Sequence, residues 1–158
     1  MVRSIKIFRM VTCLAVPFLT FSASPVFGQT GNVQMFPTTQ EGFYAAAQNF
    51  ANCSGHLTFV ASLAKRFERN DAATAFEDLA RGWEVAGMFL LAESMSSERE
   101  TETEETFKYM VASKVTFMKA QYEADPVGSL KDFNNDFEKN CKPLAETQKK
   151  IIELMRRG

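Results

Sequence analysis

A stripe of apolar side chains begins at Phe43 and recurs at alternating steps of three and four residues. Residues with this spacing share one face of an α-helix. The stripe consists of Phe43, Ala46, Phe50, Cys53, Leu57, Val60, Ala64 and Phe67. Just before it, Thr38 and Glu41 have the three-residue spacing of a capping box. The pattern predicts a first helix over residues 41–69, with this stripe facing the protein interior.

The same spacing continues after Asn70 and Asp71, two residues that favour helix N-termini. It predicts a second helix that ends near Met95. The stripe of this helix consists of Ala72, Phe76, Leu79, Trp83, Ala86 and Leu90. Both helices are therefore amphipathic, and each needs a partner to cover its apolar face.

The second half of the second helix, residues 85–92, is apolar on every side. Such a segment is either the most enclosed part of the bundle or contacts another chain. Gly82 and Gly87 lie in or next to it, and a glycine inside a helix costs about 1 kcal/mol relative to alanine. The two glycines therefore indicate that a neighbouring backbone approaches closely.

Five glutamates crowd residues 96–107, which follow the second helix. We interpret the segment as a solvated linker and helix start, because acids favour a helix N-terminus and Thr101 and Glu104 have capping-box spacing. A cation site or a docking strip for a basic partner is the alternative. The third helix ends before Asp125 and Pro126, because proline disfavours a helical residue before it. Asp125 is predicted to cap the next helix. Its inward stripe consists of Phe107, Val111, Val115, Met118 and Tyr122.

The last segment has a stripe with the same spacing, interrupted only by Pro143. The stripe consists of Leu130, Phe133, Phe137, Cys141, Leu144, Gln148, Ile151 and Met155. Proline inside a helix removes a hydrogen bond and clashes with the previous turn, so we expect a kink or break near Pro143. Four amphipathic helices with short connections predict an all-α fold, an antiparallel four-helix bundle over residues 41–158.

The N-terminal residues have the organisation of a secretory signal. Three basic residues and no acid precede an apolar stretch too short to span a bilayer, and Val26 and Gly28 occupy the positions that signal peptidase reads. We expect residues 1–28 to be removed and residues 29–40 to form a flexible lead-in. The mature protein would then be periplasmic or secreted, with no integral membrane segment.

Removal of the signal changes the charge and the cysteine count. The whole chain has 18 basic and 19 acidic residues, and loss of Arg3, Lys6 and Arg9 takes the formal charge from −1 to −4. An acidic protein without a broad basic surface is unsuited to nucleic acid. Cys13 lies in the signal, which leaves Cys53 and Cys141 in a compartment that oxidises thiols. Both occupy inward stripes, so a single Cys53–Cys141 disulfide is predicted.

His56, the single histidine of the chain, stands three residues after Cys53. A c-type haem motif needs a second cysteine, and a carboxylate-bridged dimetal site needs more histidines. A b-type haem with His56 and Met88, Met110 or Met118 as axial ligands remains an alternative. The motifs of hydrolases, metalloproteases and phosphate-binding loops are absent from the sequence, so we expect no catalytic residue, metal or cofactor, and no enzyme activity.

Further apolar positions lie outside the inward stripes of the first two helices. They are Phe59 and Leu63, which share a second stripe with His56, and Val85, Met88, Ala92 and Met95; with His56, these seven residues are the possible interface. If exposed, they form an interface or an apolar-ligand groove; if another helix covers them, they are ordinary core. We expect a small exported accessory or inhibitor-type protein that binds a protein partner or a second copy. The alternative is a bundle that carries an apolar ligand or b-type haem.

Overall fold

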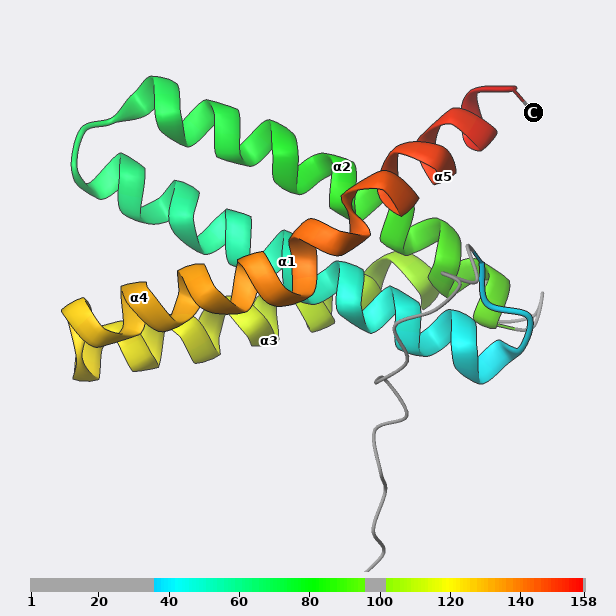
Figure 1. Ribbon diagram of the computed structural model, residues 1–158, viewed down its shortest axis with the longest axis horizontal. Coiled ribbons are helices and arrows are strands. Elements are labelled where there is room, and N and C mark those ends of the chain that lie inside the picture. Colours follow the sequence, from blue (N-terminus) through cyan, green and yellow to red (C-terminus); the bar gives the residue numbers. More distant parts are fainter. Residues whose placement is uncertain (1–35, 96–101, 158) are drawn as a thin grey trace, which may run out of the picture. The chain divides into compact units, whose positions relative to one another are not determined.

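Every regular element in residues 36–95 and 102–157, the parts of the chain that the computed structural model describes, is a helix. The main helices in chain order are α1 (Gln40–Arg66), α2 (Asn70–Ser94), α3 (Thr103–Ala124), α4 (Pro126–Asp136) and α5 (Ala145–Arg157). Figure 1 shows α1 and α2 as one antiparallel pair and α3 and α4 as another. The predicted all-α, antiparallel four-helix bundle is confirmed, with α4 and α5 as the two pieces of the last helix.

The predicted signal peptide, residues 1–28, lies outside the described residues, and so does most of the predicted lead-in, residues 29–40. Residues at the end of the lead-in take part in the fold. Phe36 packs against the hydrophobic core, and Gln40 is the first residue of α1.

The helix N-termini differ in part from the sequence expectation. The hydroxyl of Thr39, one residue after the predicted cap Thr38, accepts a hydrogen bond of 3.1 Å from the N–H of Gly42. The N-cap of α2 is Arg69, which makes no side-chain capping bond, so Asn70 is already helical. Asp125 caps α4 as predicted, because its carboxylate accepts a hydrogen bond of 3.0 Å from Gly128.

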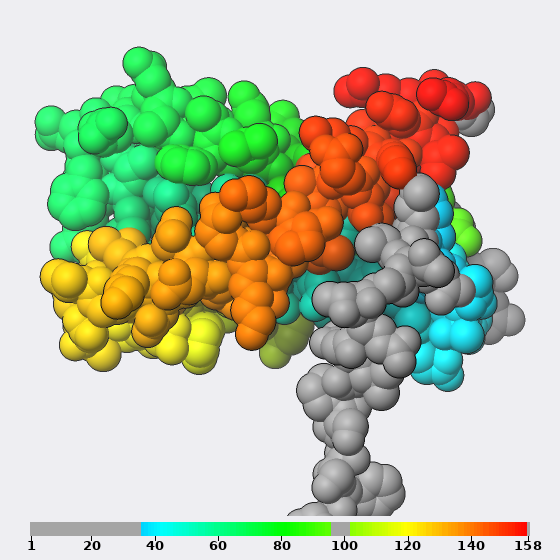
Figure 2. Space-filling view, in the orientation of Figure 1, coloured from blue at the N-terminus to red at the C-terminus, as the bar shows by residue number. Residues whose placement is uncertain are grey.

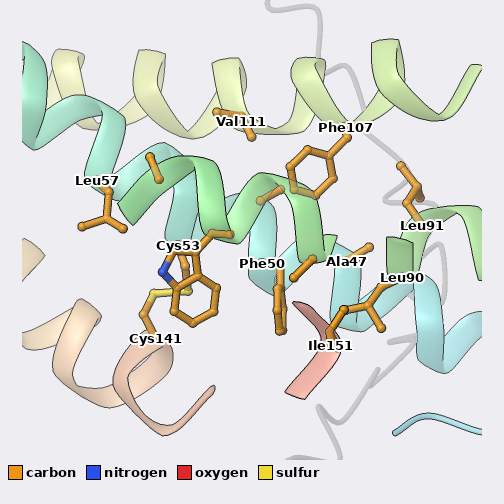
Figure 3. Packing of buried hydrophobic residues seen from close by; sticks show 14 residues of the cluster. Ala47, Phe50, Cys53, Leu57, Leu90, Leu91, Phe107, Val111, Cys141 and Ile151 are labelled. Carbon is orange, nitrogen blue, oxygen red and sulfur yellow. A yellow bond between two sulfur atoms is a disulfide. The ribbon is translucent and has the colours of Figure 1, made fainter. Parts of the chain in front are cut away.

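The larger core cluster surrounds α1, which packs against α2, against α3 and against the turn that follows α4. Phe50 and Trp83 meet edge to face in this cluster, with ring centroids 5.0 Å apart. Figure 3 shows that α2 contributes Leu90 and Leu91 to this core, α3 contributes Phe107 and α5 contributes Ile151. Side chains of every main helix except α4 therefore fill one interior.

A second, smaller core cluster covers another face of α1. Phe59 of α1, Met118 of α3 and Phe133 of α4 are all buried there. The rings of Phe59 and Phe133 stand edge to face with centroids 5.5 Å apart. In Figure 2 the orange atoms of the turns after α4 lie in front of the middle of α1.

Glycines allow the close approaches that the sequence indicated, but the neighbours of Gly82 and Gly87 are side chains and not a backbone. A Cβ on Gly87 would collide with the ring of Phe107, and one on Gly82 would lie 2.5 Å from the amide nitrogen of Gln148. At Gly55 the neighbours include the main chain of α3, because a Cβ there would lie 2.9 Å from the carbonyl oxygen of Val111. Helices α1 and α3 therefore approach each other closely at Gly55.

The last helix is interrupted before Pro143, as predicted. After α4 come a π-helical turn, Phe137–Cys141, and a 3-10 turn, Lys142–Leu144. Pro143 has no N–H to donate to the preceding turn, so a regular α-helix cannot continue through it. The N–H of Lys142 donates instead to the carbonyl of Phe137, five residues back.

The π-helical turn carries the predicted disulfide. Cys53 of α1 and Cys141 are bonded with a Cα–Cα distance of 5.6 Å, and both side chains are buried (Figure 3). The residues that follow pass to α2, where Gln148 and Ile152 lie against Gly82. The disulfide thus joins the first and last helices as expected, while α5 packs on α2.

Four residues that the stripes placed inside are exposed instead. They are Phe67, Leu79, Leu130 and Met155. Helical spacing shows that residues share a face, but that face is buried only as far as a neighbouring element extends over it. Phe67 and Leu130 matter most, because they lie at the same end of the bundle and line one pocket.

Candidate functional site

A pocket of about 390 Å³ opens where the end of α1, the start of α2 and one turn of α4 meet. We call it the apolar groove, because seven of its eight lining residues are apolar. The lining consists of Val60, Leu63, Ala64, Phe67, Arg69, Ala72, Phe76 and Leu130. In Figure 2 the teal end of α1 is visible at this place between the green atoms of α2 and the yellow atoms of α4.

The tight turn between α1 and α2 positions two of these side chains. The N–H of Arg69 donates to the carbonyl of Ala64 (2.8 Å) and the N–H of Glu68 donates to that of Lys65 (3.0 Å). This pair of bonds, with Glu68 at a φ of 57°, is the Schellman ending of a helix. It reverses the chain within three residues and places Phe67 and Arg69 at the rim of the apolar groove.

The rim of the apolar groove exposes large apolar side chains to solvent. Phe67 keeps 62% of its surface exposed and Leu130 keeps 44%. Arg69 supplies the one positive charge of the lining, and no ion pair joins it to another residue within the described ranges. An apolar hollow with a single cation favours an occupant that is apolar in the middle and acidic at one end.

The residues that the sequence singled out as a possible interface are mostly core. His56 is 5% exposed and Phe59 is 2% exposed, because α3 and α4 cover this side of α1. The interface hypothesis is therefore corrected for these two residues. This part of the second stripe of α1 is ordinary core. The ring of Phe59 packs on the rings of Phe133 and Tyr122.

The remaining interface candidates are partly buried. Leu63 lines the apolar groove and also packs against the smaller core cluster. Met88 and Met95 pack against the larger core cluster, and Val85 and Ala92 are partly buried on α2. Of the seven predicted positions, Leu63 alone belongs to the apolar groove.

His56 lies in an enclosed aromatic environment. Its ring is 5.1 Å from the ring of Phe137 and 6.2 Å from that of Phe133, and its Nδ1 is buried without a hydrogen-bond partner among the described residues. Burial, and then the positive charge of Lys114, lower the pKa of His56 to about 4, and Asp136 opposes this shift. The imidazole is therefore neutral at pH 7.

An ion pair between α3 and α4 lies beside His56. The ammonium of Lys114 is 3.1 Å from the carboxylate of Asp136, which also accepts a hydrogen bond of 2.6 Å from Asn140. Burial alone would raise the pKa of Asp136, but the hydrogen bonds from Lys114 and Asn140, together with the charge of Lys114, lower it. The pair holds opposite charges near the imidazole without bonding to it.

The residues of the haem alternative lie in or against the core. Three pockets among the described residues, of about 450, 390 and 210 Å³, are lined by side chains other than His56. Met118 is fully buried in the smaller core cluster, and Met88 packs in the larger one. Within the described ranges, no three His, Cys, Asp or Glu side chains are grouped so as to hold a metal ion.

The acidic segment that follows α2 is described only in part. Residues 96–101, which include the predicted cap Thr101, lie outside the described residues. Glu104 forms an ion pair with Lys108 one turn along α3, and this contact lowers the pKa of Glu104. The solvated helix start remains the interpretation of this segment.

The apolar groove was not predicted from the sequence, because Phe67 and Leu130 were assigned to inward stripes. A usable signal was present in the first stripe, which continues to Phe67 even though Asn70 and Asp71 indicate a helix boundary immediately afterwards. An apolar residue at the last position of a helix, next to a turn, has few neighbours to cover it.

No family model matches the chain, and searches of the curated proteins and of the solved structures gave no match either. In the described parts of the chain, no helix is both long enough and apolar enough to cross a membrane. Function is therefore inferred from the geometry of the described residues.

Proposed function

We propose that the protein is a small exported helical-bundle protein that acts by protein–protein interaction, as an accessory or inhibitor-type factor. The observation that carries the proposal is the apolar groove, whose rim exposes Phe67 and Leu130. Exposed apolar surface around a hollow is typical of interaction sites, since exposure of such side chains to water has a free-energy cost.

The occupant that fits the apolar groove is one amphipathic helix of a partner protein. The hollow accepts a few large apolar side chains, as helix-in-groove recognition requires. A glutamate or aspartate on the partner helix, close to those side chains, would pair with Arg69. The signal-like N-terminal residues and the cystine support export of such a protein.

Site-specific photo-crosslinking in the source cells tests the proposal. A benzophenone amino acid replaces Phe67 or Leu130 in two variants of the full-length protein. The control variant carries it at Val127, which is more exposed than either residue, at 83%, but does not line the apolar groove. We expect a discrete protein adduct from positions 67 and 130 and not from position 127.

Mass spectrometry of the adduct decides between the outcomes. An adduct with one other protein, or with a second copy of this chain, supports interaction at the apolar groove. Equal adducts from positions 67, 130 and 127, or no protein adduct from positions 67 and 130, would overturn the proposal. Circular dichroism of each variant shows whether the helices remain intact.

An apolar small molecule is the second candidate occupant, because the volume of about 390 Å³ lies in the range of small-ligand sites. Purified protein would then enhance the fluorescence of 1-N-phenylnaphthylamine, and Leu63→Asp would abolish the enhancement. The b-type haem form of this candidate predicts a Soret band that His56→Ala removes. Dye binding without any protein adduct would favour this candidate over interaction with a protein.

A further inference from the structure

A second groove lies between the N-terminal half of α1 and the first turns of α3. Its volume is about 450 Å³, and we call it the tyrosine–amide groove. The lining consists of Tyr44, Gln48, Asn49, Asn52, Thr106, Tyr109, Met110 and Ser113. It shares no residue with the apolar groove, so a ligand bound here is independent of the proposed function.

Close packing at one point of the α1–α3 pair explains why this groove opens. Gly55 brings α1 against the backbone of α3 at Val111. Toward the N-terminus of α1 the facing positions carry side chains on both helices, such as Tyr44 and Tyr109. The groove therefore lies between two facing stripes of side chains. The stripe on α1 runs in one-turn steps from Tyr44 to Asn52, which are about 12 Å apart along the helix axis.

The lining of the tyrosine–amide groove is polar and carries no charge. Seven of its eight side chains bear hydroxyl or amide groups, and Met110 is the exception. Charged residues make up 23% of the chain, so their absence from this lining is a distinct feature. The lining therefore has no charged group that would attract an ion or require a counter-charge.

The polar side chains of this groove are also available for binding. None of the seven makes a side-chain hydrogen bond to another residue in the described ranges. Each amide supplies both donors and an acceptor, and each hydroxyl can do either. Tyr44 is 41% exposed and Tyr109 is 75% exposed, so both rings are accessible to a ligand.

We propose that the tyrosine–amide groove binds an uncharged oligosaccharide. A sugar ring has an apolar face of C–H groups, which packs on a tyrosine ring, and an edge of hydroxyls, which exchange hydrogen bonds with amides and hydroxyls. An elongated, uncharged groove with two tyrosines and three amides matches both features. Its length of about 12 Å exceeds that of one sugar ring and suits two linked rings.

Saturation-transfer NMR on the full mature protein tests this proposal. The probes are chitohexaose, cellohexaose and maltohexaose, each added separately. We expect saturation transfer to the ring protons of at least one of them. Tyr109→Ser should weaken that binding about fivefold, which corresponds to the roughly 1 kcal/mol that a stacked ring contributes.

Phe117→Ser is the matched control, because Phe117 is an exposed aromatic residue on the same helix outside the groove. This variant should bind the oligosaccharide as the unmodified protein does, and Asn49→Ala should bind it less tightly. Absence of transfer to all three probes would overturn the proposal. Equal weakening by Tyr109→Ser and Phe117→Ser would overturn it as well.

Discussion

Cys53 and His56 stand one helical turn apart, and their burial has different explanations. Cys53 was predictable, because an inward cysteine in an oxidising compartment needs a partner and Cys141 occupies an inward stripe as well. The environment of His56 was not predictable, because the rings that enclose it come from α4 and the π-helical turn, far along the chain. Periodicity identifies a face of a helix and does not identify its neighbour.

The buried imidazole predicts how stability depends on pH. In the unfolded chain His56 has the ordinary pKa of 6.5, and in the folded chain its pKa is about 4. The unfolded chain therefore binds the proton first, and the free energy of unfolding falls as the pH falls from 6.5 towards 4. The loss is about 3 kcal/mol, since one pKa unit corresponds to about 1.4 kcal/mol.

His56→Leu tests this pH dependence by chemical denaturation at several pH values. The variant removes a titrating group and a buried Nδ1 without a hydrogen-bond partner among the described residues, so at pH 7 it should be as stable as the unmodified protein or more stable. Near pH 4.5 its advantage should be larger. Asp136 contributes a separate loss only below its ordinary pKa of 3.8, because its pKa is lowered in the folded chain. Parallel stability curves for the two proteins would contradict the assignment.

Helices were predictable in type and approximate extent, whereas their ends and their neighbours were less so. Pro143 and Asp125 act locally, so the break in the last helix and the cap of α4 followed from the sequence. Thr38 and Thr39 are equally suitable N-cap residues, so the sequence pattern does not decide which of them caps α1. The packing of α5 on α2 depends on the direction of the chain after the π-helical turn, and no periodicity encodes that direction.

The turn between α1 and α2 holds a strained residue whose replacement should stabilise the protein. Glu68 has a φ of 57°, which costs a residue with a Cβ about 1 kcal/mol or more, while glycine adopts this conformation freely. Glu68→Gly should raise the free energy of unfolding by about 0.5 kcal/mol, after the greater flexibility of glycine in the unfolded chain is subtracted. Urea denaturation at pH 7 measures the change.

Glu68→Ala is the control for this turn, because it removes the carboxylate and keeps the Cβ. It should leave the free energy of unfolding nearly unchanged. If the alanine variant gains as much stability as the glycine variant, the charge of Glu68 and not its backbone conformation is responsible.

Helix α1 is the element around which the rest of the described chain is arranged. Its inward stripe faces the larger core cluster, and its second stripe, with Phe59, faces the smaller one. The two grooves occur where this coverage ends: one along the last turns of α1 and one beside its first turns. Both proposed binding sites are thus consequences of how α3 and the last helix lie on α1.

The disulfide is the covalent part of that arrangement. It closes a loop of 88 residues between α1 and the π-helical turn, and the loop-entropy estimate for such a closure is roughly 4 to 5 kcal/mol. A small domain has a total stability of similar size, so much of this fold depends on the bond. The disulfide keeps the π-helical turn after α4 against α1. Residues in and next to that turn cover His56 and Phe59.

The most direct test of this disulfide is peptide mapping by mass spectrometry of the protein purified from its source cells, after alkylation and without reduction. We expect one cross-linked peptide pair that contains Cys53 and Cys141, with neither cysteine alkylated. Alkylated Cys53 or Cys141 in the folded protein, or a bond from either residue to Cys13 or to a second copy of the chain, would contradict the arrangement of the first and last helices described above.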